Sequence, residues 1–183
     1  PDTTIVSGFR PLMKRWIGLW GTEKTNVDAV IRALDKRVKV SANVFETLLL
    51  QAQFPPENRR RLDELLSCKG TIEETQEAIM NLTKKDAEIT ASVNQLMSIL
   101  ALLPRYGLAT RCVIDLGLAR GFDYYTGIIF EAVSPRSPTS IGGGGRYDTL
   151  VTAFGGPSTP ATGFSIGIDR VTMLVSNIVH QSA

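Results

Sequence analysis

The chain has 183 residues, of which 43% are hydrophobic and 21% charged, and its formal net charge is +2. This composition is ordinary for a folded globular protein and excludes extensive disorder, while so small a charge gives no evidence for nucleic acid binding. No apolar run approaches the roughly 20 residues that cross a bilayer, and the first ten residues lack the layout of a signal peptide. We therefore expect a cytoplasmic protein without a membrane partner.

Neither the cysteines nor the single histidine predicts a metal site. Cys68 and Cys112 lack the spacing of metal ligands, and His180 stands alone near the end of the chain. A zinc site built from Cys and His is therefore not expected, and both thiols should be reduced.

The part of the chain before residue 104 predicts short helices after one strand-like segment, TTIVSGF. Asn26 or Thr25 is a suitable N-cap for one helix and Asn43 for the next, and Thr71 with Glu74 has the spacing of a capping box. The predicted helices cover residues 11–20, 27–37, 44–50, 57–68 and 72–82. From residue 84 to residue 103, apolar side chains recur on one face, which predicts a helix that packs on a large partner surface.

The aromatic and basic clusters of this part have structural interpretations. Trp16 and Trp20 stand four residues apart on one helical face, which favours packing over base stacking. The run RRR at 59–61 is typical of a solvated helix face, with a phosphate contact as the alternative. Neither cluster identifies a function.

The part after residue 104 predicts strands, turns and a final helix. TRCVIDLGL at 110–118 and GIIFEAV at 127–133 have the β-branched content of strands and predict a hairpin, with YYTG as the break between them. Residues 147–154 are amphipathic and bounded by glycines, and residues 161–179 predict a strand that runs into a helix.

Two glycine-rich segments, GGGGRYD and GFSIGIDR, raise the question of a nucleotide site. Neither has the spacing or the lysine of a P-loop, and neither matches the G-x-G-x-x-G turn of a Rossmann fold. Gly163 and Gly167 instead leave bare backbone on a strand, against which a flat group can lie, and Arg170 beside them supplies a charge for phosphate. The residues therefore favour a planar, anionic ligand such as a nucleotide.

Three segments in this order carry a family resemblance: LARGFDYYTGIIFE, GGGGRYDTLV and GFSIGIDR. They resemble the two histidine-specific signatures and the class II motif 3 of histidyl-tRNA synthetases. The resemblance is close over residues 111–179. It extends more loosely to FRPLMKRWIGLWG and VIRALDKR, which are similar to the beginning of that family's helical insertion.

The resemblance implies an α+β fold, with part of the antiparallel sheet of a class II catalytic core and a helical insertion domain. It divides the chain into residues 1–91, the helical insertion with a short strand-like segment, and residues 92–183, the C-terminal part of the core. The sheet is expected to come from segments after Arg111, with an edge that is exposed or completed by a partner.

The resemblance also implies a reaction and its residues. The family activates histidine with ATP and Mg²⁺, transfers it to tRNA(His) and works as a homodimer. The implied roles are catalysis by Arg120, recognition of histidine by Tyr125 and Tyr147, phosphate binding by Arg170, and room for adenine at Gly163 and Gly167. Tyr124 is expected to be structural, and Mg²⁺ is expected to enter with the nucleotide and not through a protein metal site.

Motifs 1 and 2 of the family are not found in the sequence, nor is its C-terminal anticodon-binding domain. We therefore expect this chain to be part of a synthetase and to be inactive alone. One alternative is the regulatory subunit of ATP phosphoribosyltransferase, a paralogue that binds ligands without aminoacylation. Another is a synthetase-like domain that senses uncharged tRNA within a kinase. Arg120 and Arg170 together favour the synthetase, because a regulator has no transition state to stabilise.

Overall fold

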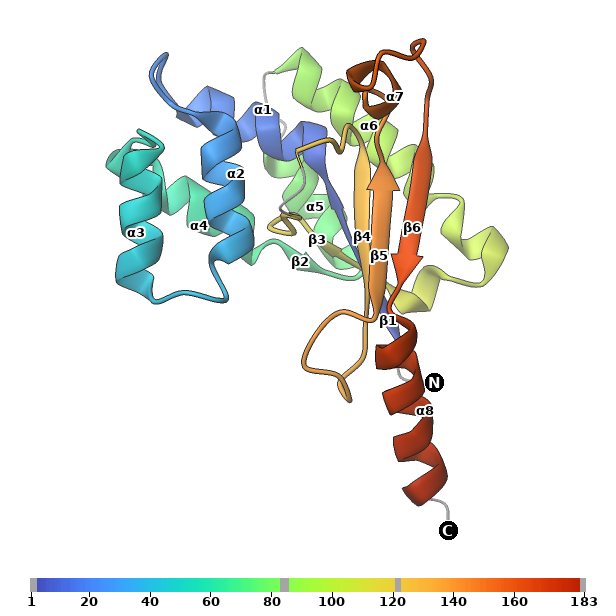
Figure 1. Cartoon of the computed structure of the whole chain (residues 1–183). Coiled ribbons are helices and arrows are strands. Elements are labelled where there is room, and N and C mark those ends of the chain that lie inside the picture. The colour runs from blue at the N-terminus through green and yellow to red at the C-terminus, as the bar shows by residue number, and fades with distance from the viewer. Residues whose placement is uncertain (1–2, 83–85, 121–122, 182–183) are drawn as a thin grey trace.

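The computed structural model describes residues 3–82, 86–120 and 123–181, and Figure 1 shows a sheet beside a group of helices. In these ranges the sheet has six strands in the order β2-β3-β1-β4-β5-β6. The strands are β1 (Thr4–Phe9), β2 (Lys69–Gly70), β3 (Cys112–Asp115), β4 (Ile128–Val133), β5 (Gly142–Arg146) and β6 (Thr162–Ile166). The fold is therefore α+β, as the sequence predicts.

Strand β1 lies in the middle of the sheet. It pairs in parallel with β3, where Ile5 faces Cys112, and antiparallel with β4, where Val6 faces Glu131. The hairpin predicted over 110–118 and 127–133 is therefore wrong, and so is the expectation that the sheet comes only from segments after Arg111. The stretch between β3 and β4 is longer than a tight hairpin loop, so β1 can insert between them.

The helices are α1 (Arg10–Trp20), α2 (Val27–Lys36), α3 (Ala42–Gln51), α4 (Arg59–Ser67), α5 (Ile72–Leu82), α6 (Ala87–Leu100), α7 (Leu150–Ala153) and α8 (Ile168–Gln181). Short 3₁₀ turns occupy Pro56–Asn58, Leu103–Tyr106 and Ala109–Arg111. The amphipathic segment predicted over 147–154 forms only the single turn α7. The long helix predicted from residue 84 to residue 103 forms as α6, which ends at Leu100, and the second of these turns follows it. Residues 84 and 85 lie outside the described residues.

Local capping accounts for where several helices begin. The Asn26 side chain accepts a hydrogen bond from the backbone N–H of Ala29 at 3.0 Å, and Thr71 and Glu74 form the predicted capping box. The cap of α3 is Ser41 and not Asn43, which corrects the prediction. Ser41 precedes the helix with extended backbone angles, the conformation that an N-cap residue adopts.

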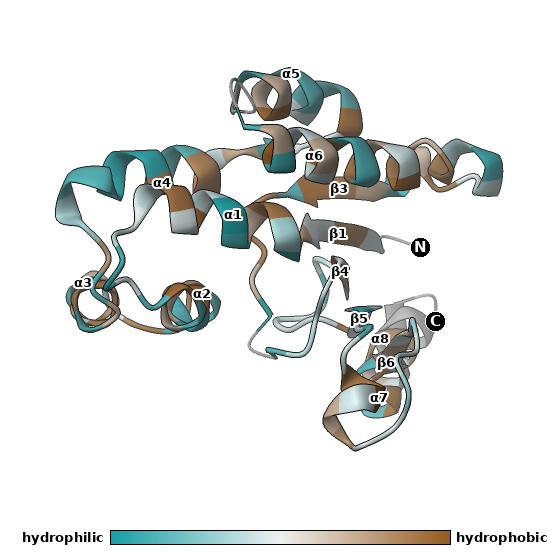
Figure 2. Cartoon of the chain, turned by 90° about the horizontal axis from the view of Figure 1, so that it is seen from above, coloured by the Kyte–Doolittle hydropathy of each residue, from teal (hydrophilic) through white to brown (hydrophobic). Residues whose placement is uncertain are grey.

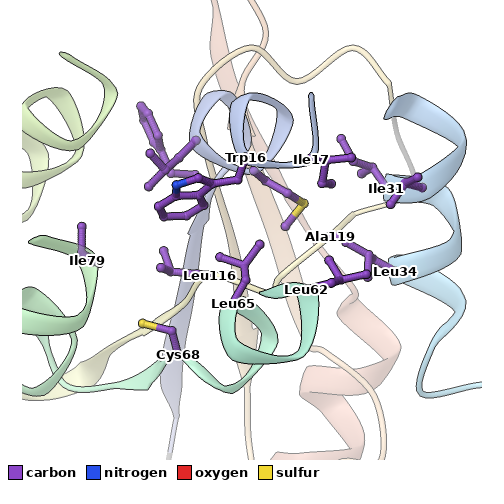
Figure 3. Close-up of a cluster of buried hydrophobic side chains, with 14 of the residues drawn as sticks. Trp16, Ile17, Ile31, Leu34, Leu62, Leu65, Cys68, Ile79, Leu116 and Ala119 are labelled. Carbon is purple, nitrogen blue, oxygen red and sulfur yellow. The ribbon is translucent and has the colours of Figure 1, made fainter. Parts of the chain in front are cut away.

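The main core lies where the helices meet the inner strands, and Figure 3 shows part of it. Trp16 is only 2% exposed and stacks on Trp20 with ring centroids 6.2 Å apart, which confirms packing as the role of this pair. The predicted apolar face of α6 is buried in the same core. Buried members of the core include Leu12, Ile17, Ile31, Leu34, Leu62, Leu65, Ile79, Ile89, Val93, Leu96, Leu100 and Ile114.

The helices are distributed unevenly around the sheet. In Figure 2, α5 and α6 lie on the β3 side, whereas α7 and α8 lie beside β6 at the other end. The same view shows α2, α3 and α4 gathered beyond α1, away from β5 and β6. The division of the chain at residues 91 and 92 stays a prediction.

One face of the sheet is apolar and open where β5, β6 and α8 meet. Phe164 and Ile166 on β6 are 70% and 57% exposed, and Val175 on α8 is also exposed. Together with Ile5 and Phe130 they line a pocket of about 540 Å³. None of the helices in the described ranges combines the length and the apolar content that a membrane span needs.

Candidate active site

Four consecutive glycines form most of β5, and their bare backbone makes the floor of the candidate site. A Cβ built on Gly143 would collide with the guanidinium of Arg120, and a Cβ on Gly145 would lie 2.8 Å from the ring of Tyr125. On the neighbouring strand, Gly163 pairs with Gly145, and a Cβ there would collide with the Tyr147 hydroxyl. Glycine is therefore required because side chains from elsewhere lie directly on the backbone.

The Arg120 side chain is held on this floor by two acceptors from β4. Its Nη1 donates to the backbone oxygen of Phe130 at 3.2 Å and lies 3.4 Å from Oε1 of Glu131. The side chain is 17% exposed, so the ion pair is partly shielded from water. Both contacts involve Nη1, so they fix the orientation of the guanidinium over Gly143.

Three tyrosine rings gather next to Arg120. The ring of Tyr124 lies 4.6 Å from that of Tyr125 and 5.7 Å from that of Tyr147, and the Tyr125 and Tyr147 rings are 6.3 Å apart. Burial, and then the Tyr124 hydroxyl, raises the pKa of Tyr125 to about 12. The phenol of Tyr125 therefore stays protonated at neutral pH, where it can donate one hydrogen bond.

The tyrosines line a pocket of about 240 Å³ that also includes Gly143, Gly163 and Ser165. We call this the tyrosine pocket. Its walls combine aromatic rings with hydroxyl groups, which suits a small planar group that carries hydrogen-bonding atoms.

A second pocket, of about 360 Å³, contains both candidate arginines, Arg120 and Arg170. We call this the arginine pocket. It also includes Gly167 and Asp169 at the start of α8, and the Arg170 guanidinium donates to the backbone oxygen of Ser140. Two guanidinium groups beside the N-terminus of a long helix favour an anionic ligand, and phosphate is the group that arginine binds with matching geometry.

The two pockets adjoin, because Gly143 and Ser165 line both of them. The structure therefore brings Arg120, Tyr125, Tyr147 and Arg170 into one region over β5 and β6. The two glycines that were predicted to make room for a nucleotide lie in different pockets. Gly167 lies in the arginine pocket, whereas Gly163 lies in the tyrosine pocket under Tyr147.

Sequence reasoning missed Ser165, Glu131 and Gly143. Gly143 and Ser165 pair across β5 and β6, so alternation along a correctly placed β6 would have put Ser165 on the same face as Gly163. The pairing of Glu131 with Arg120 carries no sequence signal of its own. Within the described ranges, no group of three or more His, Cys, Asp or Glu side chains could hold a metal ion.

Comparison with known proteins identifies the family of the chain. A family model described as histidyl-tRNA synthetase matches residues 2–171. The histidine–tRNA ligase of Pyrococcus horikoshii is 40% identical over 172 residues, which is 93% of this chain and 39% of that protein. The ligase of Thermococcus kodakarensis is 38% identical over the same shares of the two chains.

Solved structures have the same fold. The crystal structure of histidyl-tRNA synthetase from Nostoc sp. PCC 7120 superposes with a TM-score of 0.81 at 25% identity, over 99% of this chain and 43% of that one. An ATP phosphoribosyltransferase regulatory subunit/histidyl-tRNA synthetase from Bacillus halodurans gives 0.72 at 24% identity, over 92% and 43%. The chain thus spans about two fifths of the length of the relatives it matches. By the family model and these identities, it belongs to the histidyl-tRNA synthetase family.

Proposed function

We propose that this chain is part of a histidine–tRNA ligase, in which the tyrosine pocket takes the side chain of histidine and the arginine pocket takes the phosphates of ATP. The observation that carries the proposal is the junction of the two pockets at Gly143 and Ser165, with Arg120 lying on Gly143. Activation requires a carboxylate and an α-phosphate to meet, and adjoining pockets supply that proximity.

Arg120 is proposed as the catalytic residue. When a carboxylate oxygen of histidine attacks the α-phosphorus, a new O–P bond forms, the bond to pyrophosphate breaks, and negative charge accumulates at phosphorus. A guanidinium already oriented by Phe130 and Glu131 stabilises that charge without having to reorganise. Arg170 is proposed to bind the other phosphates, and Mg²⁺ would arrive with the nucleotide and screen their charge.

The tyrosine pocket is proposed to select histidine. The imidazole ring needs a hydrogen-bond partner at each nitrogen, and Tyr125 and Tyr147, which both line the pocket, each offer a hydroxyl. The Tyr125 hydroxyl is protonated throughout the physiological range, as a phenol ordinarily is, and its raised pKa keeps it so. Gly163 and Gly167 are proposed to serve the site indirectly, since their bare backbone lets Tyr147 and Arg170 lie close to β6 and to its end.

Aminoacylation is proposed for a protein that contains this chain, because the chain spans 39% of the length of its relative from Pyrococcus horikoshii. In that protein we propose tRNA(His) as the acceptor, a homodimer as the assembly and the cytoplasm as the location. The isolated chain is expected not to aminoacylate, since it contains no segment similar to motifs 1 and 2.

The second candidate function is a regulatory subunit of ATP phosphoribosyltransferase. One similar solved structure carries both names in its description, and at 24% identity that likeness supports the fold alone. The arginine pocket argues for the ligase. A regulator needs to bind histidine-like ligands but has no use for a guanidinium placed where charge develops during bond formation.

Histidine-dependent exchange of pyrophosphate into ATP, measured on the protein that contains this chain, tests the proposal. Arg120→Ala should lower the exchange rate at least about a hundredfold, because the loss of a transition-state charge contact costs about 3 to 4 kcal/mol. ATP binding should change far less, since Arg170 is untouched.

Arg60→Ala is the matched control, because Arg60 is also an arginine but its side chain is 90% exposed and pairs with Glu64 one helical turn away. It should leave exchange unchanged. Histidine binding without any exchange in the unaltered protein would favour the regulatory function. Near-normal exchange in Arg120→Ala would remove Arg120 from the reaction.

A further inference from the structure

Asp123 has no role in the reaction proposed above, yet two arginines converge on it. Its Oδ1 lies 3.3 Å from Nη2 of Arg10, and its Oδ2 lies 2.8 Å from Nη1 of Arg32. Each carboxylate oxygen therefore has its own guanidinium. We call these three residues the Asp123 cluster.

Arg10 is the buried member of the cluster. It is the first residue of α1, its side chain is 1% exposed, and its Nη1 donates to the backbone oxygen of Arg120 at 3.1 Å. Its backbone N–H donates to the oxygen of Gly127, also at 3.1 Å. Arg10 thus forms hydrogen bonds with three residues, Arg120, Asp123 and Gly127. These lie before and after the two adjacent tyrosines in the sequence.

Asp123 offsets part of the cost of burying the charge of Arg10. Burial lowers the pKa of Arg10, and the carboxylate of Asp123 works in the opposite direction. A buried guanidinium without a carboxylate is strongly unfavourable, so the Arg10–Asp123 pair is needed for folding as well as for position.

Arg32 is different, because neither burial nor charge balance requires it. It lies on α2, in the helical part of the chain, and its side chain is 45% exposed. Asp123 already has a partner in Arg10. What Arg32 adds is a second, directional contact from α2, which restrains Asp123 on the side that Arg10 does not reach.

We propose that Arg32 is a positioning residue, which acts through Asp123 to hold Arg120 and Tyr125 at their places in the site. The inference rests on the proposed function for its effect on the reaction. Arg120 lies three positions before Asp123 and Tyr125 two positions after it. Arg10 joins the Asp123 carboxylate to the backbone oxygen of Arg120, so a movement of Asp123 affects the guanidinium through Arg10 and the phenol through the backbone. By this route α2 contributes to the position of Arg120 and Tyr125, which line the two pockets.

The chain offers a closely matched control for Arg32. Lys14 on α1 and Asp28 on α2 form an ion pair at 2.8 Å, with side-chain exposures of 41% and 44%, close to those of Arg32 and Asp123. Lys14→Gln therefore removes an ion pair of similar exposure that also involves α2 but does not include Asp123. Arg32→Gln and Lys14→Gln are compared directly, and Arg32→Lys tests whether a charge at this position restores the function.

The first measurement is amide hydrogen exchange of this chain, in peptides that contain Asp123 to Gly127. Arg32→Gln should accelerate exchange there severalfold, Lys14→Gln should not, and the two variants should melt at similar temperatures. If Arg32→Gln leaves amide hydrogen exchange in these peptides unchanged, the proposal is overturned, whatever the catalytic properties of the protein.

The second measurement is pyrophosphate exchange by the protein that contains this chain. Displacement of a catalytic group by about an ångström costs up to about a hundredfold, so a partly restrained segment should lose on the order of tenfold in kcat. The KM for histidine should rise less, and Arg32→Lys should recover part of the rate. Equal losses in Arg32→Gln and Lys14→Gln would reduce Arg32 to a structural contact. Absence of pyrophosphate exchange in the unaltered protein would contradict the proposed function. The amide hydrogen exchange measurement would then decide whether Arg32 is a positioning residue.

Discussion

Gly143→Ala tests whether the bare backbone of β5 positions Arg120. The new methyl group would overlap Nη1 of Arg120 and would lie 2.9 Å from its Cζ and 2.6 Å from the Phe130 backbone oxygen. Ordinary contact begins near 3.4 Å, so the guanidinium must retreat and the strand must shift. Overpacking of this kind costs about 1 to 3 kcal/mol, and in a chain of this size each kcal/mol lowers the melting temperature by about 2 to 4 °C.

The effect on the reaction should exceed the effect on stability. Because Arg120 would leave its acceptors on β4, pyrophosphate exchange by the protein that contains the chain should fall by about a hundredfold. Gly18→Ala is the control, since Gly18 is exposed in α1 and a Cβ there meets nothing within 4 Å. It should leave exchange unchanged and raise stability by about 0.5 to 1 kcal/mol. Normal exchange in Gly143→Ala would refute the placement of Arg120 over Gly143.

Three further predictions concern single side chains. Arg120→Lys should restore little of the exchange lost in Arg120→Ala, because a point charge does not reproduce the guanidinium fork; full recovery would show that charge alone suffices. Tyr147→Phe should raise the KM for histidine by about fivefold to a hundredfold with a nearly unchanged melting temperature, as one unpaired polar group costs about 1 to 3 kcal/mol; an unaltered KM would remove Tyr147 from the histidine site. The ion pair with Arg15, and then the N–H of Ile89, lowers the pKa of Asp86. Its carboxylate therefore stabilises the fold above the unfolded pKa of about 4 and loses that effect as the pH falls through the lower folded pKa. Melting curves of Asp86→Asn should differ from the unaltered chain at pH 7 and converge with it in acid, and a constant difference would contradict this assignment.

Local signals in the sequence predicted local structure well. The Asn26 cap, the box of Thr71 and Glu74 and the apolar face of α6 all depend on neighbours within one or two turns, and the structure confirms each of them. The position of β1 could not be predicted in this way. Whether β3 pairs with β4 or with β1 is decided by packing between residues far apart in the chain.

The residues of the candidate site likewise differ in whether the sequence could predict them. The family resemblance predicted Arg120, Tyr125, Tyr147 and Arg170 as candidates. Such signatures mark residues that are far apart in the sequence but belong to one site. Glu131 was missed because it belongs to the site only through a contact across the sheet.

The parallel pairing of β1 with β3 has a consequence for how the chain folds. Ile5 and Cys112 are neighbours in the sheet, but α1 to α6 lie between them in the sequence. The centre of the sheet therefore cannot form until a long stretch of chain has been closed into a loop, and pairings of this kind slow folding. If the helices fold first, they bring the two strand ends together and remove most of this delay. Loop closure costs only about 0.6 kcal/mol for each doubling of loop length, so the thermodynamic cost depends little on how large the inserted helical part is. Its size can vary at this crossover, provided that α2 still presents a guanidinium to Asp123.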